Sequence, residues 1–301
     1  MKQTPHSFDI LGNIAIVKFS RETNSKEKKQ FAKEIMESNK SITTVLEKTR
    51  GFQGRLRKQQ TKFVAGENTK EAKYKENNCV FRFNIDSTYF SSRLSNERKE
   101  LAKKIKKGKK VLVMFAGVAP FSIVIAKNSQ ANKVYSNEIN REANKYAKLN
   151  IELNKLKEKV ILLPGDVKKI VEKINNLHSP SARGIKNDNK KDISLTRGSS
   201  INSKSSRATL ERDEIPNKFD VIVMPRPQLK DTFLKQAFSL SKKGTRIYYY
   251  DFCKEDETDS VIERIKHEAS ISRKKIKILN KKAAGEIAPY KIRLRVDFRV
   301  M

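Results

Sequence analysis

The feature that most limits the possible folds is an alternation of apolar β runs with helical stretches from about residue 95 to the C-terminus. Strands that alternate with helices of this length are joined by right-handed crossovers into a parallel sheet. We therefore predict an α/β fold with a Rossmann-like, doubly wound, mostly parallel sheet, whose last strand is an antiparallel edge strand. The predicted strands are Val111–Met114, Lys133–Asn137, Val160–Leu163, Asp220–Met224, Thr245–Tyr250 and Lys291–Val300, and the predicted helices are Pro120–Lys127, Arg141–Asn154, Val167–Asn175, Lys230–Leu240 and Asp256–Ile271.

Residues 1–90 follow a different pattern, which is typical of a small α+β domain. Short β signals bounded by glycines accompany one charged helix, and such signals indicate strands separated by turns. We expect a domain boundary near residue 90, followed by a larger domain over residues 91–301. The signals are β runs at Ile10–Phe19, Lys62–Ala65 and Val80–Ile85, and a helix near Lys26–Ser38.

Residues 178–217 do not fit the alternation. They are rich in Ser, Asn, Lys and Arg and have almost no periodic apolar residues. Such a composition cannot bury enough apolar surface to order a chain. We predict a disordered insertion between the third and fourth strands, which is either a tolerated loop or an added basic segment.

The charge balance points to a polyanionic partner. With 66 basic and 34 acidic residues, the formal net charge is +32, and self-repulsion of this size is typical of proteins that bind polyanions. Nucleic acid is favoured over an anionic membrane. No run of about 18 apolar residues exists, so no spanning helix is expected. Cys79 and Cys253 form neither a metal-ligand spacing nor a disulfide framework, which predicts a cytoplasmic protein without a metal.

The turn after the first predicted strand is the usual nucleotide site of such a sheet. Its sequence from Phe115 to Phe121 contains only Gly117, so it is not a dinucleotide fingerprint. Glu138 ends the second strand, where an acidic residue binds ribose hydroxyls, and Asp166 follows the third strand, within reach of an adenine amino group. Together they favour an adenosyl ligand without a diphosphate, such as S-adenosylmethionine. The alternatives are a helix N-terminal charge for Glu138 and an N-cap for Asp166.

Several segments in this order resemble the archaeal and eukaryotic tRNA (guanine-37-N1)-methyltransferase family, which is of class I and uses S-adenosylmethionine. The resemblance covers nearly the whole chain apart from residues 178–217, and it implies methyl transfer to N1 of the guanine 3′ to the anticodon. It also implies a monomer without an obligate protein partner. Relatives often carry a further N-terminal domain, which we do not expect here. The segments are ENNCVFRFNIDSTYFSSRLSNERKELA, VLVMFAGVAPF, VYSNEIN, VMPRP, RIYYYDF and GEIAPYKIRLRVDF.

The resemblance assigns roles to individual residues. Glu97 is the expected general base that removes the N1 proton of guanine, and Arg57 is expected to stabilise the charge that develops on O6. The short loop VMPRP is expected to face the base, although two prolines also simply end a strand. The residues expected to bind the substrate are Arg93, Arg98, Tyr89, Pro225 and Pro227, and those expected to bind the cofactor are Phe115, Gly117, Pro120, Phe121, Glu138, Asp166 and Met224.

Two other functions remain open on the sequence alone. A related family transfers the aminocarboxypropyl group of the same cofactor during wyosine synthesis, but Arg93-Leu94 replaces the Gly-Asn expected there. A non-catalytic tRNA-binding relative is the other alternative, because Val113 and Pro225 stand where relatives carry Asp and Asn. These two departures predict weaker cofactor binding. Spacing alone favours a different interpretation of Glu97, as an ordinary residue on a helix surface paired with Arg93 at i, i+4, and only the resemblance reverses this.

Overall fold

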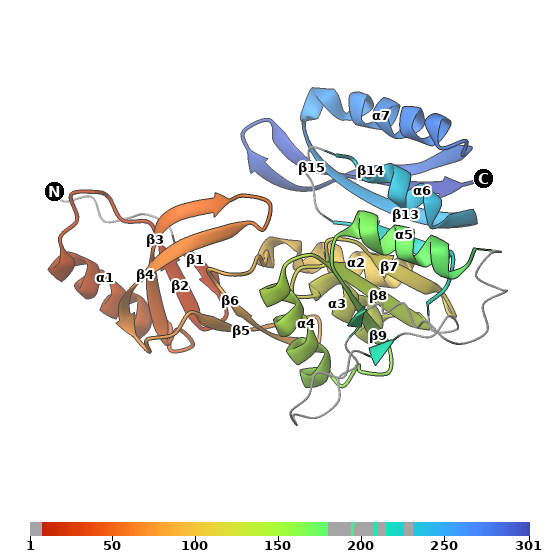
Figure 1. Ribbon diagram of the computed structural model, residues 1–301. Helices are drawn as coiled ribbons and strands as arrows, with labels where there is room; N and C mark the ends of the chain where they lie inside the picture. The colour runs from red at the N-terminus through yellow and green to blue at the C-terminus, as the bar shows by residue number, and fades with distance from the viewer. Residues whose placement is uncertain (1–7, 180–193, 196–207, 210–214, 226–230) are drawn as a thin grey trace.

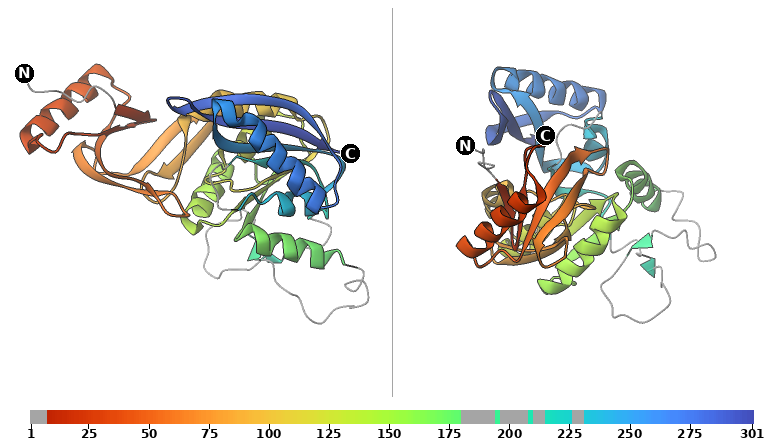
Figure 2. Two further views of the ribbon diagram at one scale, coloured as in Figure 1. Left: turned by 90° about the horizontal axis from the view of Figure 1, so that it is seen from above. Right: turned by 90° about the vertical axis from the view of Figure 1, so that its left-hand side faces the viewer.

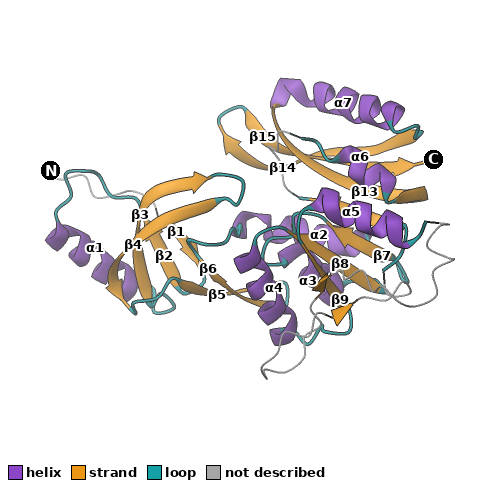
Figure 3. Cartoon of the chain, in the orientation of Figure 1, coloured by secondary structure: helices purple, strands orange, loops and turns teal. Residues whose placement is uncertain are grey.

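The computed structural model describes residues 8–179, 194–195, 208–209, 215–225 and 231–301. A smaller, strand-rich part with one helix precedes a larger part with helices on both faces of a sheet (Figure 1, Figure 3). The helices are α1 Ser25–Ser38, α2 Ser95–Lys104, α3 Pro120–Asn128, α4 Arg141–Leu153, α5 Val167–Leu177, α6 Leu234–Ser239 and α7 Thr258–Ile271, with short 3₁₀ helices η1 Ser92–Leu94 and η3 Glu255–Glu257. The strands are β1 Phe8–Leu11, β2 Ile14–Val17, β3 Thr44–Gln53, β4 Lys58–Gly66, β5 Glu71–Glu76, β6 Cys79–Asn84, β7 Lys110–Val113, β8 Lys133–Glu138, β9 Val160–Pro164, β10 Ser194–Leu195, β11 Ala208–Thr209, β12 Phe219–Met224, β13 Ser241–Lys254, β14 Ile276–Ala288 and β15 Lys291–Val300.

The large sheet has the strand order β14-β15-β13-β12-β7-β8-β9. The five strands from β13 to β9 are parallel, and β15 runs antiparallel to both of its neighbours. The predicted doubly wound, mostly parallel sheet is therefore confirmed. The predicted antiparallel direction of the last strand is also correct, but its position at the edge is wrong, because β14 pairs with β15 and forms the edge.

Helices cover the two faces of this sheet in two layers. Apolar residues of α2, α3 and α4 form one buried cluster with the side chains of β7 and β8 that point to that face. Those of α5, α6 and α7 form a second cluster on the other face, where α7 lies over β13 and β15 (Figure 1). Because both faces of the parallel strands are covered, β7 is apolar at nearly every position, as buried parallel strands usually are.

The smaller part contains a four-stranded sheet in the order β1-β2-β3-β4, with α1 in the crossover between the parallel strands β2 and β3. The predicted strand Ile10–Phe19 is instead a tight hairpin that turns at Gly12. Gly12 has a φ of +61°, and a Cβ there would lie 1.9 Å from the carbonyl oxygen of Lys73, so only glycine fits. Figure 2 shows this sheet and the large sheet side by side along the molecule.

The β5–β6 hairpin joins the two parts through an unusual contact with α4. Asn150 and Asn154 are one helical turn apart. Their side-chain amides form hydrogen bonds with backbone groups of β6, as the backbone of a neighbouring strand would. The Asn150 Oδ1 accepts from Arg82 N at 2.7 Å and its Nδ2 donates to Arg82 O at 3.1 Å, and Asn154 makes the same two bonds to Val80 at 3.0 and 2.7 Å. The buried edge of β6 is thereby satisfied without another strand.

Other differences from the predicted elements are local. The helix predicted over Lys230–Leu240 is shorter and comprises α6 only. Strands β3, β5, β10, β11 and β14 were not predicted, and the pairing of β10 with β11 lies inside the predicted disordered insertion, so the prediction of disorder is wrong there. Most of the predicted disordered insertion lies outside the described residues, although at its two ends His178 Nε2 lies 2.8 Å from the carbonyl oxygen of Ile215. Among the described residues, no helix is long and apolar enough to cross a membrane. The boundary near residue 90 stays a prediction.

Candidate functional site

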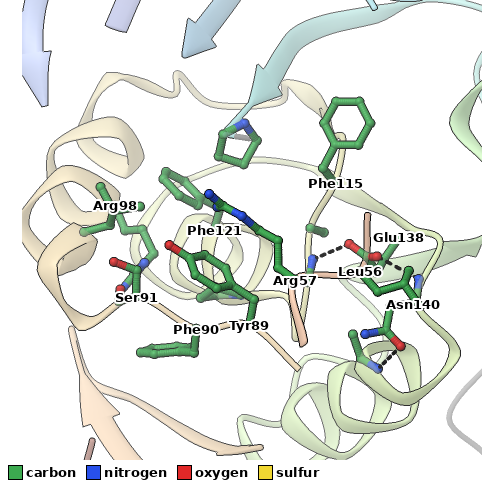
Figure 4. Close-up of a pocket in the computed structure, with 16 residues that line it drawn as sticks. Leu56, Arg57, Tyr89, Phe90, Ser91, Arg98, Phe115, Phe121, Glu138 and Asn140 are labelled. Carbon is green, nitrogen blue, oxygen red and sulfur yellow. Dashed lines mark hydrogen bonds between the residues drawn. The ribbon is translucent and has the colours of Figure 1, made fainter. Parts of the chain in front are cut away.

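A cavity of about 70 Å³ opens at the carboxyl ends of β7, β8 and β12, on the side that faces the smaller part (Figure 4). The segments that line it include the β3–β4 turn, the stretch between β6 and α2, the β7–α3 turn, the end of β8 and the end of β12. Ligand cavities of proteins are usually several times larger, about 300–1,000 Å³. The cavity in this state is therefore small for a nucleoside.

The β7–α3 turn has a strained backbone. Phe115, Gly117 and Ala119 have positive φ angles of 57°, 59° and 68°, a conformation that costs the two non-glycine residues about 1–3 kcal/mol each. Pro120 occupies the first turn of α3, where its missing N–H is no loss. Such strain is typical of ligand sites, and the turn places Phe115, Gly117, Pro120 and Phe121 on the cavity wall.

Glu138 fixes this turn from the end of β8. Its Oε2 accepts from the Gly117 N–H at 2.8 Å and its Oε1 accepts from the Asn140 N–H at 2.7 Å. Only 7% of Glu138 is exposed, and it lines the cavity. A carboxylate has about four acceptor positions, so Glu138 retains capacity for ribose hydroxyls while holding the turn.

Asp166 lies outside the cavity lining. It caps α5, since its side chain accepts from Lys168 N at 2.9 Å, and it forms an ion pair with Arg55 Nη2 at 2.6 Å. Although burial works in the opposite direction, the hydrogen bonds from Arg55 and Lys168 lower the pKa of Asp166. The N-cap alternative is therefore correct, and Arg55 occupies the carboxylate that was expected to bind adenine. We call this ion pair the Arg55–Asp166 latch.

The opposite wall carries the cation expected to act on the base. The Arg57 guanidinium stacks on the Tyr89 ring at 4.5 Å, and Phe52 packs edge-on to the same ring at 4.9 Å. Arg57 has a φ of 49°, so the β3–β4 turn holds it in a conformation that non-glycine residues rarely adopt. Arg57 and Tyr89 both line the cavity (Figure 4).

Arg293 on β15 is a further cation near this wall that the sequence did not single out. Its buried Nε has no hydrogen-bond partner among the described residues. Burial lowers its pKa, while hydrogen bonding to Tyr89 works in the opposite direction. Arg293 and Tyr89 are 204 positions apart in the chain (293 − 89). No local sequence pattern therefore indicates that they lie close together.

Glu97 lies behind the cavity wall, not on it. Only 5% of it is exposed, and its Oε1 accepts from the Tyr250 hydroxyl at 2.7 Å. The same oxygen is ion-paired with Arg295 Nη1, and its Oε2 lies 3.5 Å from Lys282 Nζ. Burial and the Glu97 carboxylate raise the pKa of Tyr250 well above its usual value, so this hydroxyl stays protonated and donates. The alternative of an exposed Glu97 paired with Arg93 is wrong.

The remaining candidates occupy different environments. Arg98 is 1% exposed and bound through two nitrogens to Glu76 at 2.5 Å, with one edge on the cavity. Arg93 is largely exposed, and its nearest acid is Asp9 at 3.5 Å. Pro225 lines the cavity, Met224 is buried in the sheet core, and Pro227 lies outside the described residues.

The described residues contain no cluster of three or more His, Cys, Asp or Glu side chains suited to a metal. What the site offers is a buried carboxylate at the end of the second parallel strand, an apolar wall and stacked cations. With a seven-stranded sheet whose only reversed strand is inserted between β14 and β13, this is the architecture of the Rossmann-like, class I methyltransferases.

Comparisons with known proteins narrow this class. A family model described as the TRM5/TYW2 methyltransferase domain matches residues 72–178, and one described as the TYW2 N-terminal domain matches residues 1–69. The Pyrococcus abyssi tRNA (guanine(37)-N(1))-methyltransferase Trm5b is 32% identical over 98% of this chain and 75% of that protein. The Nanoarchaeum equitans tRNA (guanine(37)-N(1))/4-demethylwyosine(37)-methyltransferase Taw22 is 33% identical over 97% of this chain and 98% of that protein.

Solved structures give the same result. The crystal structure of Trm5b from Pyrococcus abyssi has a TM-score of 0.73 and 30% identity, covering 98% of this chain and 75% of that one. The complex of aTrm5 with tRNALeu has a TM-score of 0.72 and 26% identity over 98% of this chain and 72% of that one. The chain belongs to the tRNA (guanine-37-N1)-methyltransferase family and is a methyltransferase that acts on tRNA.

Proposed function

We propose that this enzyme transfers the methyl group of S-adenosylmethionine to N1 of guanine-37 in tRNA. The observation that carries the proposal is that one cavity joins the Glu138-bound β7–α3 turn to the stacked Arg57 and Tyr89. A nucleoside cofactor and a base thus have adjacent walls. Relatives named for this activity support it, including one whose length this chain covers almost fully.

The residues present fit the cofactor. Glu138 has free acceptor capacity for a ribose, the Phe115 and Phe121 side chains provide apolar walls, and Asp166 reaches an adenine amino group once Arg55 releases it. The structure of Methanocaldococcus jannaschii Trm5 in complex with adenosine, at 25% identity and a TM-score of 0.69, supports this use of the site. When bound, S-adenosylmethionine supplies a methyl group on a sulfonium and becomes a neutral thioether.

The proposed proton acceptor is Glu97. Guanine N1 carries a proton with a pKa near that of tyrosine, so a base has to take it as the new bond forms. The proton then passes from N1 to a Glu97 oxygen, and the negative charge that develops on O6 is stabilised by Arg57. Because Glu97 lies behind the cavity wall, the flipped base has to enter deeper than the cavity described here, or the carboxylate has to turn toward it.

The remaining substrate contacts follow from the cavity wall. Tyr89 is the proposed stacking partner of the flipped guanine. The Pro225 carbonyl, at the end of β12, is a proposed acceptor for the guanine amino group. Arg93 is exposed enough to hold a phosphate, and the bound pair Arg98–Glu76 supports the wall on which Phe90 and Phe121 pack.

The test is methyl transfer from labelled S-adenosylmethionine to an unmodified tRNA transcript with G37, beside a transcript with A37. Glu97→Gln is compared with Glu100→Gln, a control on the same helix that also contacts Arg295. We expect label on G37 only, a loss of at least 100-fold with Glu97→Gln, and a small loss with Glu100→Gln. Equal losses of methyl transfer in the two variants would mean that the ion pairs with Arg295 matter, and that Glu97 is not the base.

A second candidate is methylation of 4-demethylwyosine at the same position. It is favoured by the match to Taw22, whose name includes this substrate and whose length the chain covers to 98%. Assaying tRNA that carries 4-demethylwyosine distinguishes the two substrates. Transfer of label from the aminocarboxypropyl carbons, with none from the methyl carbon, would instead identify the wyosine-pathway chemistry.

A further inference from the structure

The face of β15 that is turned away from α5–α7 is almost entirely charged. Every second residue of β15 is buried in the apolar cluster under those helices, namely Ile292, Leu294, Val296, Phe298 and Val300. The residues between them therefore point to the other face. Helix α2 covers the middle of this second face, where Arg295 binds Glu97 and Glu100. Beyond the C-terminal end of α2 the face stays open. The intervening residues are Arg293, Arg295, Asp297 and Arg299.

The open part carries a row of cations across three strands. Arg299 on β15 is the register partner of Arg246 on β13 and of Lys277 on β14. Like charges directly opposite each other destabilise a sheet. Among the described residues, none of the three is ion-paired with a carboxylate. The arrangement therefore has an electrostatic cost, although Arg246 also forms a hydrogen bond with the Tyr248 hydroxyl.

A hollow of about 360 Å³ lies over this row. Its charged lining residues are Lys104, Arg246, Arg299 and Asp297, and the exposed Leu279 forms one side. Asp297 is ion-paired with Lys104 at 3.3 Å and accepts from Arg295 Nε at 2.7 Å, so it leaves Arg246 and Arg299 without an ion-pair partner in the described part of the chain. We call this hollow the β15 groove. It has room for an anion and an excess of positive charge.

The geometry points to the phosphate backbone of the bound tRNA as the ligand of the β15 groove, and we propose this as a second contact site, remote from the reacting base. This inference rests on the proposed function. Arg299 is six residues from Arg293 along β15 (299 − 293), about 20 Å at 3.4 Å per residue. An RNA stem-loop that inserts a base into the cavity also presents phosphates at that distance. Guanidinium groups are suited to them because they bind two phosphate oxygens at once.

The test is the salt dependence of tRNA affinity for the Arg246→Gln/Arg299→Gln variant. Each lost phosphate contact lowers the slope of log affinity against log salt by about 1. We expect a slope smaller by about 1–2 and an affinity about ten-fold or more lower at low salt. Methyl transfer at saturating tRNA should keep its rate, so that KM rises while kcat does not change.

Matched variants exclude simpler explanations. Lys169→Gln/Lys173→Gln on the exposed face of α5 removes the same charge from the opposite layer and should change the slope little. Arg246→Lys/Arg299→Lys should retain most of the affinity. The melting temperature of the Gln variant should not fall, because the repulsion is relieved, and this verifies its fold.

An unchanged slope, or an equal fall in the α5 control, would overturn the inference. So would identical tRNA isotherms for the wild type and the Gln variant when inorganic phosphate stabilises only the wild type. The last would identify a free-anion site. Binding of polyglutamate at this groove without any effect on tRNA would also overturn it, in favour of an acidic protein partner. If the wild type itself bound no tRNA, the proposed function would fail instead.

Discussion

Arg295 has no exposed surface, and its guanidinium contacts three carboxylates, those of Glu97, Glu100 and Asp297. Removing a buried cation leaves buried carboxylates without compensation, which usually costs about 3–5 kcal/mol. We predict a loss of this size in the free energy of unfolding for Arg295→Met, measured by urea denaturation. Adding Glu97→Gln should recover part of the loss in a double-mutant cycle. A loss below about 1 kcal/mol would contradict this view of the network.

Glu100 gives the same network a pH dependence. The hydrogen bond from Lys282, opposed by burial and assisted by Arg295, lowers the pKa of Glu100 to about 2 from its usual 4.5. A group whose pKa is lowered by folding stabilises the protein above its unfolded pKa and loses that contribution as the pH falls through the folded value. Wild type and Glu100→Gln should therefore differ most in stability above pH 4.5 and converge toward about pH 2. Because Glu100 is partly exposed, the difference is modest, and a difference independent of pH would contradict the assignment.

Helix α4 offers a test at the scale of elements. Asn150 is fully buried, and its amide satisfies both the N–H and the C=O of Arg82 at the edge of β6. Asn150→Leu leaves these backbone groups without partners, at about 1–3 kcal/mol each, so we predict a loss of about 2–6 kcal/mol in the free energy of unfolding. Lys145→Ala, on the exposed side of the same helix, should change stability by less than about 0.5 kcal/mol. Equal effects of the two variants would mean that α4 does not serve as a strand edge.

The β3–β4 turn should compete with the cofactor. The Arg55–Asp166 latch ties this turn to the end of β9, beside a cavity that is too small for a nucleoside. An exposed ion pair contributes about 0.2–1 kcal/mol, so Arg55→Gln should tighten S-adenosylmethionine binding by up to about five-fold, as measured by calorimetry. Arg50→Gln, in the same hairpin but outside the latch, is the control. Weaker binding with Arg55→Gln would show that Arg55 itself contacts the cofactor.

For the whole molecule, the sequence predicts best the strands that are buried on both faces, and the strands that it misses are not of this kind. Strands such as β7 are apolar at nearly every position because helices cover both of their faces, so they are recognised easily. The missed strands β5 and β14 are rich in charged residues and partly exposed, and β14 forms the edge of the large sheet. Their strand structure depends on a pairing partner, which a local pattern does not encode.

The same distinction applies to the site. Glu138 and Gly117 are brought together as expected, because neighbouring parallel strands end at one edge of a sheet. The partners of Glu97 were not foreseen, since Arg295 is 198 residues away in the chain. Arg55 was missed as well, because an exposed arginine in a turn has no sequence signal for an acid 111 residues later. The ion-pair partners of the predicted residues therefore come from distant elements of the chain, which the sequence does not indicate.

The net charge of +32 leads to a prediction about the whole fold. Repulsion between like charges disfavours the compact state, and the screening length falls from about 30 Å at 0.01 M salt to about 10 Å at 0.1 M. The melting temperature of the RNA-free protein should therefore rise as potassium chloride is added over this range. Scanning calorimetry at fixed pH measures it, with sulfate at equal ionic strength as a comparison, because bound anions would add to screening. A melting temperature that falls with added chloride would mean that exposed ion pairs stabilise the fold more than the repulsion destabilises it. Bound RNA would then not stabilise the fold by reducing this repulsion.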